Sequence, residues 1–508
     1  MLEAITAEQA RAIEARFVAE TGEPLLTLMR RAGATVAEQV DELSLDGRIV
    51  VLAGPGNNGG DGWIAARLLH AAGRDVVVCA LKGPADLMGD ASVAAREAAD
   101  AGVAWRVPAV PELISHLFEA EVVVDALLGT GSSLPLRDEV RLWCAAVSES
   151  GVPVVAVDLP TGVDADSGAA DPDAIDAVAT VTFLAAKRGL VVYPGAQHSG
   201  DVIVAELGVE PRAIESQGAL EIWEPDDVSE LVPLPAPDAH KNSRGRLLVL
   251  AGSLRFPGAA VLAARGAMRA GAGYVTVAVP APAVPAVQAH LQAAPVVGLT
   301  AAEDGGFAVD ALAEALELCE RADAVVLGPG LTRAEEAAAF AREVYRSAAC
   351  PLLVDADALN ALVGHTDLLG ERSGPTVLTP HAGELARLLS MGVGDVQADR
   401  VSSSARLVGP GRVTVLKGAG TVVSGLTRQA VVASGTPALA TAGTGDVLSG
   451  IIGALLAQGL EEYEAAVVGA YLHGLAGELA AADLTPVCVN AEDVPDYLPG
   501  AVSSLLQW

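Results

Sequence analysis

A glycine-rich turn followed by an aspartate lies at residues 441–450, which read T-A-G-T-G-D-V-L-S-G. Gly443, Thr444 and Gly445 precede an apolar run of helical length, so their N–H groups can face an anion from the start of a helix. Asp446 then lies in the first helical turn, where a carboxylate can accept the proton of a hydroxyl that meets a phosphoryl group. The alternative is a structural turn in which Asp446 only favours the helix start.

Other polar segments of the second half follow predicted strands in the same way. They are V-L-G-P-G-L at 326–331, V-D-A-D-A-L-N at 354–360, L-T-P-H-A-G-E at 378–384 and V-L-K-G-A-G-T at 415–421. The carboxyl ends of parallel strands meet at one sheet edge, where α/β enzymes bind ligands. Lys417 and the amides after it suit nucleotide phosphates, and His381 suits a phosphate or sugar unless it is a core or capping residue. Asp355 and Asp357 suit magnesium or a helix cap, and we assign no metal there.

A second glycine-rich string, G-P-G-N-N-G-G-D-G, occupies residues 54–62 between a predicted strand and a predicted helix. Its glycines allow close backbone approach, Asn57 and Asn58 supply amide groups, and Asp61 can cap the next helix. The string is neither a Walker A loop nor a standard dinucleotide fingerprint. It therefore predicts a ligand-binding loop of another kind, with a purely structural loop as the alternative.

Two further strand ends of the first half carry polar residues, in V-D-A-L-L-G-T-G at 124–131 and V-D-L-P-T-G at 157–162. The oxygens of Asn58, Asp125 and Thr161 are hard ligands, which suit an alkali or alkaline-earth cation. Such a cation would offset the negative charge of a phosphate held by the glycines at 129–131. Asp158 is the best candidate for acid or base catalysis in this half. Each aspartate alone could be a loop cap, but together they favour a site.

Strand and helix patterns alternate through both halves, which predicts parallel sheets covered by helices on both faces. We predict strands in the first half at 48–53, 75–81, 122–126, 153–158 and 178–183, and helices at 6–20, 25–40, 62–72 and 91–101. The second half has predicted strands at 246–251, 274–279, 323–327, 351–355, 376–379 and 412–416, then a hairpin at 420–433. The alternation lapses at a proline cluster, so we predict domains at 1–215 and 240–508 with a linker at 216–239. His240 and Lys241 open the second domain.

The composition and charge of the chain disfavour some classes of binding partner. The chain has 508 residues and a formal net charge of −32, which disfavours nucleic acid or an anionic membrane as a partner. A small anionic ligand remains compatible, because local dipoles and bound cations override the net field. The five cysteines form no paired motif, no secretory signal opens the chain, and the apolar stretch at 447–460 is too short to span a bilayer. We therefore expect a reduced, cytoplasmic protein without a membrane segment.

With these strings in place, residues 5–208 resemble the NAD(P)H-hydrate epimerase domain, a Rossmann-like α/β/α fold. The segment F-L-A-A-K-R-G-L at 183–190 belongs to the resemblance. The family implies that potassium binds Asn58, Asp125 and Thr161, and that Asp158 is catalytic and contacts the hydrated nicotinamide. The remaining implied substrate-binding residues are Asn57, Asn58, Gly59, Gly60, Asp61, Gly129, Thr130, Gly131, Ser132, Ser133, Leu134 and Pro135.

Residues 240–505 resemble the ribokinase-like superfamily, also three-layer α/β/α, and within it the nucleotide-dependent NAD(P)H-hydrate dehydratase domain. L-T-P-H-x-G-E together with G-T-G-D carries that resemblance. The family implies that Asp446 is the catalytic base, and that Ala259, Gly330 and His381 contact the hydrated dinucleotide. The implied ADP or ATP contacts are Lys417, Gly418, Ala419, Gly420, Thr421 and Gly445.

These resemblances predict a bifunctional repair enzyme that uses potassium, magnesium and ADP or ATP. The first domain would epimerise the R and S forms of hydrated NADH or NADPH, and the second would phosphorylate the S hydroxyl and eliminate phosphate. The alternatives are a ribokinase-like vitamin-type kinase fused to a non-catalytic nucleotide-binding domain, and a binding or scaffold role for the first half. The sequence leaves open the donor, the preferred substrate, channelling between domains and the oligomeric state, and a homo-oligomer is compatible with it.

Overall fold

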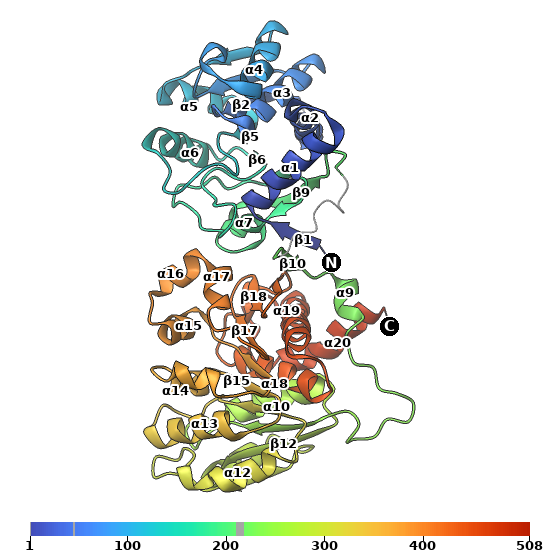
Figure 1. Ribbon diagram of the computed structural model, residues 1–508, viewed down its shortest axis with the longest axis vertical. Coiled ribbons are helices and arrows are strands. Elements are labelled where there is room, and N and C mark those ends of the chain that lie inside the picture. Colours follow the sequence, from blue (N-terminus) through green and yellow to red (C-terminus); the bar gives the residue numbers. More distant parts are fainter. Residues whose placement is uncertain (1, 44–45, 210–217, 508) are drawn as a thin grey trace. The chain divides into compact units, whose positions relative to one another are not determined.

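The computed structural model describes residues 2–43, 46–209 and 218–507 (Figure 1). The chain divides into two compact units. One is Glu3–Leu220 with the short segment Gln397–Asp399, and the other is Glu221–Val396 with Met1–Leu2 and the residues from Arg400 onward. Each unit is built on a mainly parallel sheet with helices on both faces, as the sequence predicts.

The first domain contains a parallel sheet with the strand order β4-β3-β2-β5-β6-β7-β9. The chain turns in opposite directions from β2 and β5, so the crevice for a ligand is expected outside the carboxyl ends of these two strands. The strands are rich in valine and buried on both faces, as parallel strands between helices must be. Helices α2, α3 and α4 pack on one face and α5 and α6 on the other.

The strands of this domain are β1 (Leu2–Ile5), β2 (Arg48–Ala53), β3 (Val76–Ala80), β4 (Ala104–Arg106), β5 (Ala120–Ala126), β6 (Val154–Val157), β7 (Ala179–Phe183), β8 (Ala186–Lys187) and β9 (Asp201–Ala205). The helices are α1 (Ala7–Thr21), α2 (Leu25–Leu43), α3 (Asn57–Ala71), α4 (Gly89–Asp100), α5 (Val110–Phe118), α6 (Asp138–Ser150), α7 (Arg188–Val191) and α8 (Gly195–His198).

The second domain contains strands in the order β13-β12-β11-β14-β15-β16-β17-β18-β19. They run parallel as far as β17, and β18 and β19 form the predicted antiparallel hairpin. The direction of winding changes between β11 and β14, which places this domain's ligand crevice at their carboxyl ends.

The strands of the second domain are β10 (Leu220–Ile222), β11 (Arg246–Leu250), β12 (Tyr274–Pro280), β13 (Val296–Leu299), β14 (Ala324–Leu327), β15 (Leu352–Val354), β16 (Thr376–Leu378), β17 (Arg412–Leu416), β18 (Thr421–Ser424) and β19 (Gln429–Val432). The helices are α9 (Pro225–Ser229), α10 (Pro257–Arg269), α11 (Val284–Gln288), α12 (Leu312–Cys319), α13 (Glu335–Ser347), α14 (Ala356–Ala361), α15 (Ala382–Leu389), α16 (Val393–Ala398), α17 (Arg400–Ala405), α18 (Thr444–Ala457), α19 (Glu462–Leu484) and α20 (Val494–Leu506).

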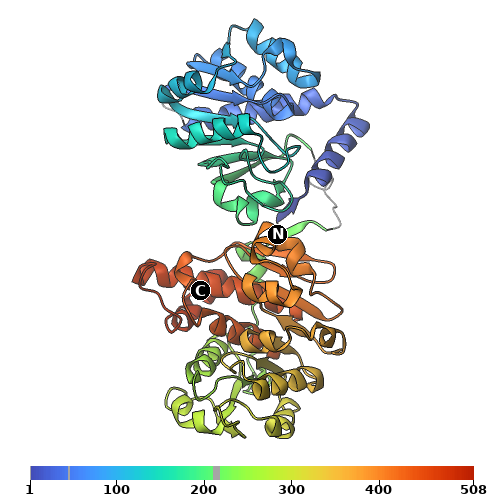
Figure 2. The same cartoon turned by 90° about the vertical axis from the view of Figure 1, so that its left-hand side faces the viewer.

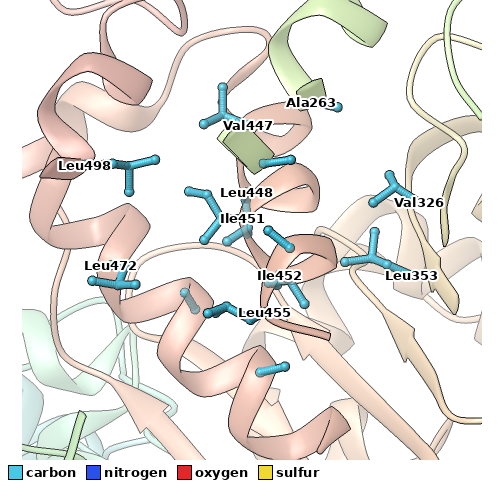
Figure 3. Packing of buried hydrophobic residues seen from close by; sticks show 14 of the residues in the cluster. Ala263, Val326, Leu353, Val447, Leu448, Ile451, Ile452, Leu455, Leu472 and Leu498 are labelled. Carbon is cyan, nitrogen blue, oxygen red and sulfur yellow. The ribbon is translucent and has the colours of Figure 1, made fainter. Parts of the chain in front are cut away.

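Helix α18 is apolar around most of its circumference and lies inside the core. Figure 3 shows Val326 and Leu353 on one side of the helix and Leu472 and Leu498 on the other. A Cβ added at Gly450 would lie 1.9 Å from the carbonyl oxygen of Ala263 on α10, so the two helix backbones are in close contact. This packing holds the N-terminus of α18, which carries Asp446, in a fixed position.

Helix α19 is the one helix among residues 2–43, 46–209 and 218–507 that could span a membrane by length and composition. Sequence analysis considered only the apolar stretch at 447–460, which overlaps α18, and did not single out α19. Within the apolar window of α19, 72% of the residues are buried inside the protein, as in a core helix. The two views in Figures 1 and 2 show the second domain's helices gathered around its sheet.

Three features differ from the sequence prediction. Part of the predicted linker forms β10 and α9, and both Trp223, between these elements, and Val228, on α9, are buried in the core of the second domain. Helix α3 begins at Asn57, with Gly56 at its N-cap, so Asp61 lies inside the helix and is not the cap. Strands β1, β4, β8, β9 and β13 were not predicted. The predicted boundary at residues 215 and 216 lies outside the described residues.

Candidate active sites

A cavity of about 850 Å³ opens at the carboxyl ends of the strands in the first domain. Its walls come from α1, the start of α3 and the segments that follow β2, β5 and β6. The predicted site residues that line it are Asn57, Asn58, Asp61, Gly129, Thr130, Gly131, Ser132, Ser133 and Asp158. The structure thus brings together three motifs that are separated by up to a hundred residues in the sequence.

Four of the predicted substrate-binding residues do not line this cavity. Gly59 and Gly60 are buried in the first turn of α3, where a Cβ on Gly59 would lie 1.9 Å from the carbonyl oxygen of Gly54. Leu134 and Pro135 follow the lining residues 129–133, and a cis peptide bond joins them. These residues shape the loops that carry the lining groups.

Asp158 lies directly after β6 with a positive φ of 65°, which is rare for a residue other than glycine. Its Oδ1 is 2.6 Å from the Nζ of Lys187, and it accepts a hydrogen bond of 3.3 Å from Thr182 Oγ1. The Lys187 ammonium is buried and also donates to Thr182 Oγ1 and to the carbonyl oxygen of Phe183. The Asp158 carboxylate is therefore held in one orientation toward the cavity.

Two more carboxyl groups, Glu14 and Asp61, line the same cavity. Burial raises the pKa of Asp61 well above its ordinary value, and the negative charges of Asp158 and Glu14 raise it further. Burial and the charge of Asp158 also raise the pKa of Glu14. Sequence analysis did not identify Glu14 or assign a role to Lys187. The only signal for Lys187 was its place in the segment at 183–190.

The three predicted cation ligands lie around the ends of β5 and β6. Asp125 is buried and accepts hydrogen bonds from the backbone N–H and the hydroxyl of Thr161, at 2.7 and 2.8 Å. Burial raises the pKa of Asp125 to about 6, and no basic side chain within the described residues lies at ion-pair distance from it. Both side-chain amide atoms of Asn58 are buried without a hydrogen-bond partner. A buried amide without a hydrogen-bond partner and a buried carboxylate without a basic partner are groups that fit a hard cation.

The second site is centred on Asp446, the third residue of α18. Gly443 adopts a left-handed φ of 98° and forms the N-cap of α18. The first N–H groups of a helix have no partner inside it, so those of Thr444 and Gly445 can bind an anion, whereas the N–H of Asp446 donates to the carbonyl oxygen of Gly443. Burial raises the pKa of Asp446 to about 7; Asp355 adds to the rise, and Lys417 opposes it. A carboxylate with a pKa near neutrality is suited to accept a proton.

Lys417 and Asp355 form a buried ion pair beside this turn. Lys417 Nζ is 2.6 Å from Asp355 Oδ1, and Ser449 Oγ on α18 donates to Asp355 Oδ2 at 2.7 Å. A Cβ added at Gly445 would lie 3.3 Å from Lys417 Nζ, so the ammonium is next to the start of α18. Burial lowers the pKa of Lys417, but Asp355 and Glu384 outweigh it, and the pKa is raised overall. Lys417 therefore remains a cation.

His381 is the N-cap of α15, as the capping alternative predicts. Its Nδ1 accepts hydrogen bonds from the backbone N–H groups of Gly383 and Glu384, at 3.0 and 3.3 Å. Nδ1 is consequently unprotonated, and the proton of the neutral ring resides on Nε2. The side chain is 55% exposed, so Nε2 can also donate to a ligand.

The remaining predicted residues of the second site lie at the switch point and along β17. A Cβ added at Gly330, which has a φ of 67°, would lie 2.8 Å from the Cβ of Ala259, so these two residues are in contact. Gly418, Ala419 and Gly420 form the turn between β17 and Thr421, the first residue of β18. Lys417 pairs with His381 in a parallel bridge, which joins that turn to the histidine loop.

The structure identifies no side chains as magnesium ligands among the described residues. Asp355 occupies the N-cap position of α14, but its side chain bonds Lys417 and Ser449 instead of capping the helix. Asp357 accepts from the backbone N–H of Thr332 and lies 3.5 Å from Arg333. Among the described residues, no group of three or more histidines, cysteines and acidic residues is placed to hold a metal ion.

Comparisons with known proteins match both halves of the chain. A family model described as NAD(P)H-hydrate dehydratase matches residues 247–500, and one described as YjeF-related protein N-terminus matches residues 25–189. The bifunctional NAD(P)H-hydrate repair enzyme Nnr of Thermofilum pendens is 39% identical over 486 residues, covering 94% of this chain and 92% of that protein. Nnr of Escherichia coli is 35% identical over 473 residues, covering 91% and 86%.

A solved structure similar to the second half is the ADP/ATP-dependent NAD(P)H-hydrate dehydratase from Bacillus subtilis, co-crystallized with ATP and Mg²⁺. It is 30% identical, covers 56% of this chain and 99% of its own, and superposes with a TM-score of 0.49.

Proposed function

The chain belongs to the family of bifunctional NAD(P)H-hydrate repair enzymes, and from that premise we propose which of its residues carry out each half of the repair. Its N-terminal domain is the epimerase and its C-terminal domain is the dehydratase. The observation that carries the residue assignment is the placement of one oriented aspartate, Asp158 or Asp446, at the ligand crevice of each domain.

In the epimerase domain, the cavity holds the hydrated dinucleotide, and residues 129–133 bind its phosphates. Asp158 acts on the hydroxyl at C6 of the nicotinamide ring. In its protonated form Asp158 gives a proton to the hydroxyl, which leaves as water while the ring nitrogen supplies electrons, and the resulting carboxylate takes a proton back when water adds to the other face. Lys187 holds the carboxylate in place for both steps.

Potassium would be held by Asn58, Asp125 and Thr161, and it would supply positive charge beside the substrate phosphates. The buried amide of Asn58 and the buried carboxylate of Asp125 support this assignment. A cation there would also keep Asp125 ionised, in opposition to the effect of burial.

Epimerisation should therefore depend on potassium. Replacing potassium by choline, or Asn58 by alanine, should slow conversion of the R to the S epimer by about tenfold or more, since a ligand of a bound ion is lost. The measurement is the rate of R-epimer loss by chromatography, after subtraction of spontaneous epimerisation. The dehydratase rate with pure S epimer serves as the control. Equal epimerisation rates in both salts would contradict the potassium site.

In the dehydratase domain, Lys417 to Thr421 and the start of α18 at Gly445 bind ADP or ATP, and Ala259, Gly330 and His381 contact the substrate. Asp446 takes the proton of the C6 hydroxyl as the hydroxyl oxygen attacks the terminal phosphorus of ADP or ATP, whose bond to the bridging oxygen breaks so that AMP or ADP leaves. The lone pair of the ring nitrogen then breaks the C6–O bond of the new phosphate ester and expels inorganic phosphate, and loss of a C5 proton restores NADH or NADPH. Magnesium, carried by the nucleotide phosphates, would neutralise charge on the transferred group.

The dehydratase should lose activity as the pH falls through about 7. Asp446 must be ionised to accept a proton, so kcat/KM should fall about tenfold per unit below this pH and level off above it. This fall is measured from the initial rates of ADP-dependent NADH recovery from the S epimer between about pH 5.5 and 8.5. A flat profile over that range would argue against Asp446 as the base.

The whole function is tested by incubating the protein with hydrated NADH and either ADP or ATP while the absorbance of reduced nicotinamide is followed. Recovery of absorbance supports repair, whereas a stable phosphorylated product without recovery would indicate the kinase alternative. We further propose that the protein works in the cytoplasm on small molecules, and a homo-oligomer is compatible with this function.

A further inference from the structure

The chain contains only four lysines, Lys82, Lys187, Lys241 and Lys417, and its other permanently charged cationic side chains are arginines. Lys82 and Lys187 line the cavity of the epimerase domain, and Lys417 lies beside the catalytic turn of the dehydratase domain. Three of the four lysines thus lie at the two candidate sites. Lys241 is the exception, and it lines a separate cavity of about 410 Å³ in the dehydratase domain.

This second cavity lies at the opposite edge of the sheet from Asp446. It is lined by Lys241 and Asn242, by the first residues of β11 and β12, and by the segment between α12 and β14. Strand β11 has five residues and runs from the cavity at Arg246 toward the catalytic crevice, so about 16 Å separate the two edges. A ligand in the second cavity cannot contact the phosphoryl group that is transferred.

The loop that carries Lys241 is built to hold its position. The carbonyl oxygen of Lys241 lies 2.2 Å from where a Cβ on Gly273 would be, so the loop packs directly on the turn before β12. Gly273 N–H also donates to the carbonyl oxygen of Arg244, at 3.0 Å. His240 and Ser243 bond each other through backbone and side-chain groups. The cavity wall is therefore fixed at both ends of the loop.

The lining residues give the cavity a positive charge, although the chain has a net charge of −32. Arg246 is neutralised by Asp323, which accepts two hydrogen bonds from its guanidinium at 2.6 and 3.1 Å. Lys241 Nζ lies 5.5 Å from the centre of the Tyr274 ring. Within the described part of the chain, neither Lys241 nor Arg321 has a carboxylate at ion-pair distance. Two cations are thus free to meet an anion.

The remaining walls suit a planar or apolar group. Tyr274 is 38% exposed, and Leu318 and Ala322 are among the apolar residues that line the same cavity. A volume of about 410 Å³ falls within the usual range for small-molecule sites, roughly 300–1,000 Å³, and exceeds what a single phosphate ion fills. Two free cations beside an aromatic ring match a phosphate attached to a ring system.

We propose that this cavity is a second ligand site, which binds a phosphate-bearing metabolite of mononucleotide size. Lys241 and Arg321 contact the phosphate, Arg246 is held beside them by Asp323, and Tyr274 contacts the organic part. The site is separate from the catalytic nucleotide site and does not rest on the roles assigned to Asp158 or Asp446.

Because the chain has only four lysines, brief acetylation of the full-length protein followed by peptide mass spectrometry reports on Lys241 directly. AMP should slow acetylation of Lys241 several-fold in a saturable manner. In Arg321→Ala, the half-protecting AMP concentration should rise about tenfold, since one charge-assisted contact is lost. Arg346→Ala is the matched control: it removes an exposed arginine of the same domain that does not line the cavity, and protection should be unchanged. The kcat of Lys241→Ala for dehydration should equal that of the wild type.

Four results would overturn the proposal. The first is acetylation of Lys241 at the same rate with and without AMP. The second is protection that Arg321→Ala leaves unchanged, which would place the effect at the catalytic site. The third is equal protection by inorganic phosphate at the same concentration, which would indicate a simple anion site. The fourth is protection that needs no AMP and grows with protein concentration, which would indicate that a second copy covers this face.

Discussion

Asp446→Ala should remove ADP- or ATP-dependent recovery of NADH from the S epimer, with kcat lowered by about 10²- to 10⁴-fold. The carboxylate lies in the first turn of α18, and burial raises its pKa to about 7, so it can take the hydroxyl proton at neutral pH. Asp446→Asn should lose a similar factor, because the amide keeps the shape but cannot accept the proton. The measurement is single-turnover recovery of absorbance with pure S epimer.

Two observations distinguish removal of the catalytic base from unfolding of the dehydratase domain. Each variant should still epimerise the R form at the wild-type rate, because the epimerase domain has its own core and cavity. Binding of ADP should weaken little, since Lys417 stays paired with Asp355 next to Gly445. If Asp446→Asn instead kept more than about a tenth of the wild-type kcat, the proton would have to leave by another route.

The sequence predicts much of both sites because glycine-rich strings and polar residues follow predicted strands. Parallel topology then dictates that those strand ends meet, and the structure places the loops after β2, β5 and β6 around one cavity. The same reasoning placed Asp446, His381 and Lys417 at one edge of the second sheet. The strand order that parallel connections favour is enough to predict that these residues share one edge of the sheet.

The residues that sequence analysis missed lie in segments without a motif. Glu14 is one of several acidic residues on an amphipathic helix, and only the docking of α1 shows that it faces Asp158. Ser449 lies four residues after Gly445, inside an apolar helix, and its bond to Asp355 depends on how α18 packs. Such contacts arise from tertiary packing, which local sequence patterns do not encode.

The capping alternatives show the same limit. Asp355, His381 and Asp61 each permit a reading as a helix cap, yet only His381 caps with its side chain. Asp355 is at the cap position, but its carboxylate accepts a hydrogen bond from the ammonium of Lys417 and does not cap the helix. Asp61 is displaced from the cap because α3 begins at Asn57. Cap chemistry read from sequence therefore identifies the helix start more reliably than the partner of the side chain.

Asp158→Ala should leave the R epimer unrepaired while the S epimer is still converted to NADH. Epimerisation by the protein should fall by about 10²- to 10⁴-fold, because the group that protonates the C6 hydroxyl is removed. With a mixture of epimers and ADP, recovery should be fast until the S form is consumed, and should then continue only at the spontaneous rate of epimerisation. Following both epimers by chromatography gives the two rates separately.

Lys187→Met tests whether the ion pair positions this aspartate. Loss of the 2.6 Å contact should free the Asp158 carboxylate to rotate, so kcat should fall and Lys187→Arg should restore part of it. Asp201→Asn, an exposed aspartate at the start of β9, is the control and should have no effect. If Asp158→Ala retained the wild-type rate of R-epimer loss, Asp61 or Glu14 would become the group that acts on the hydroxyl, because both line the same cavity with raised pKa values.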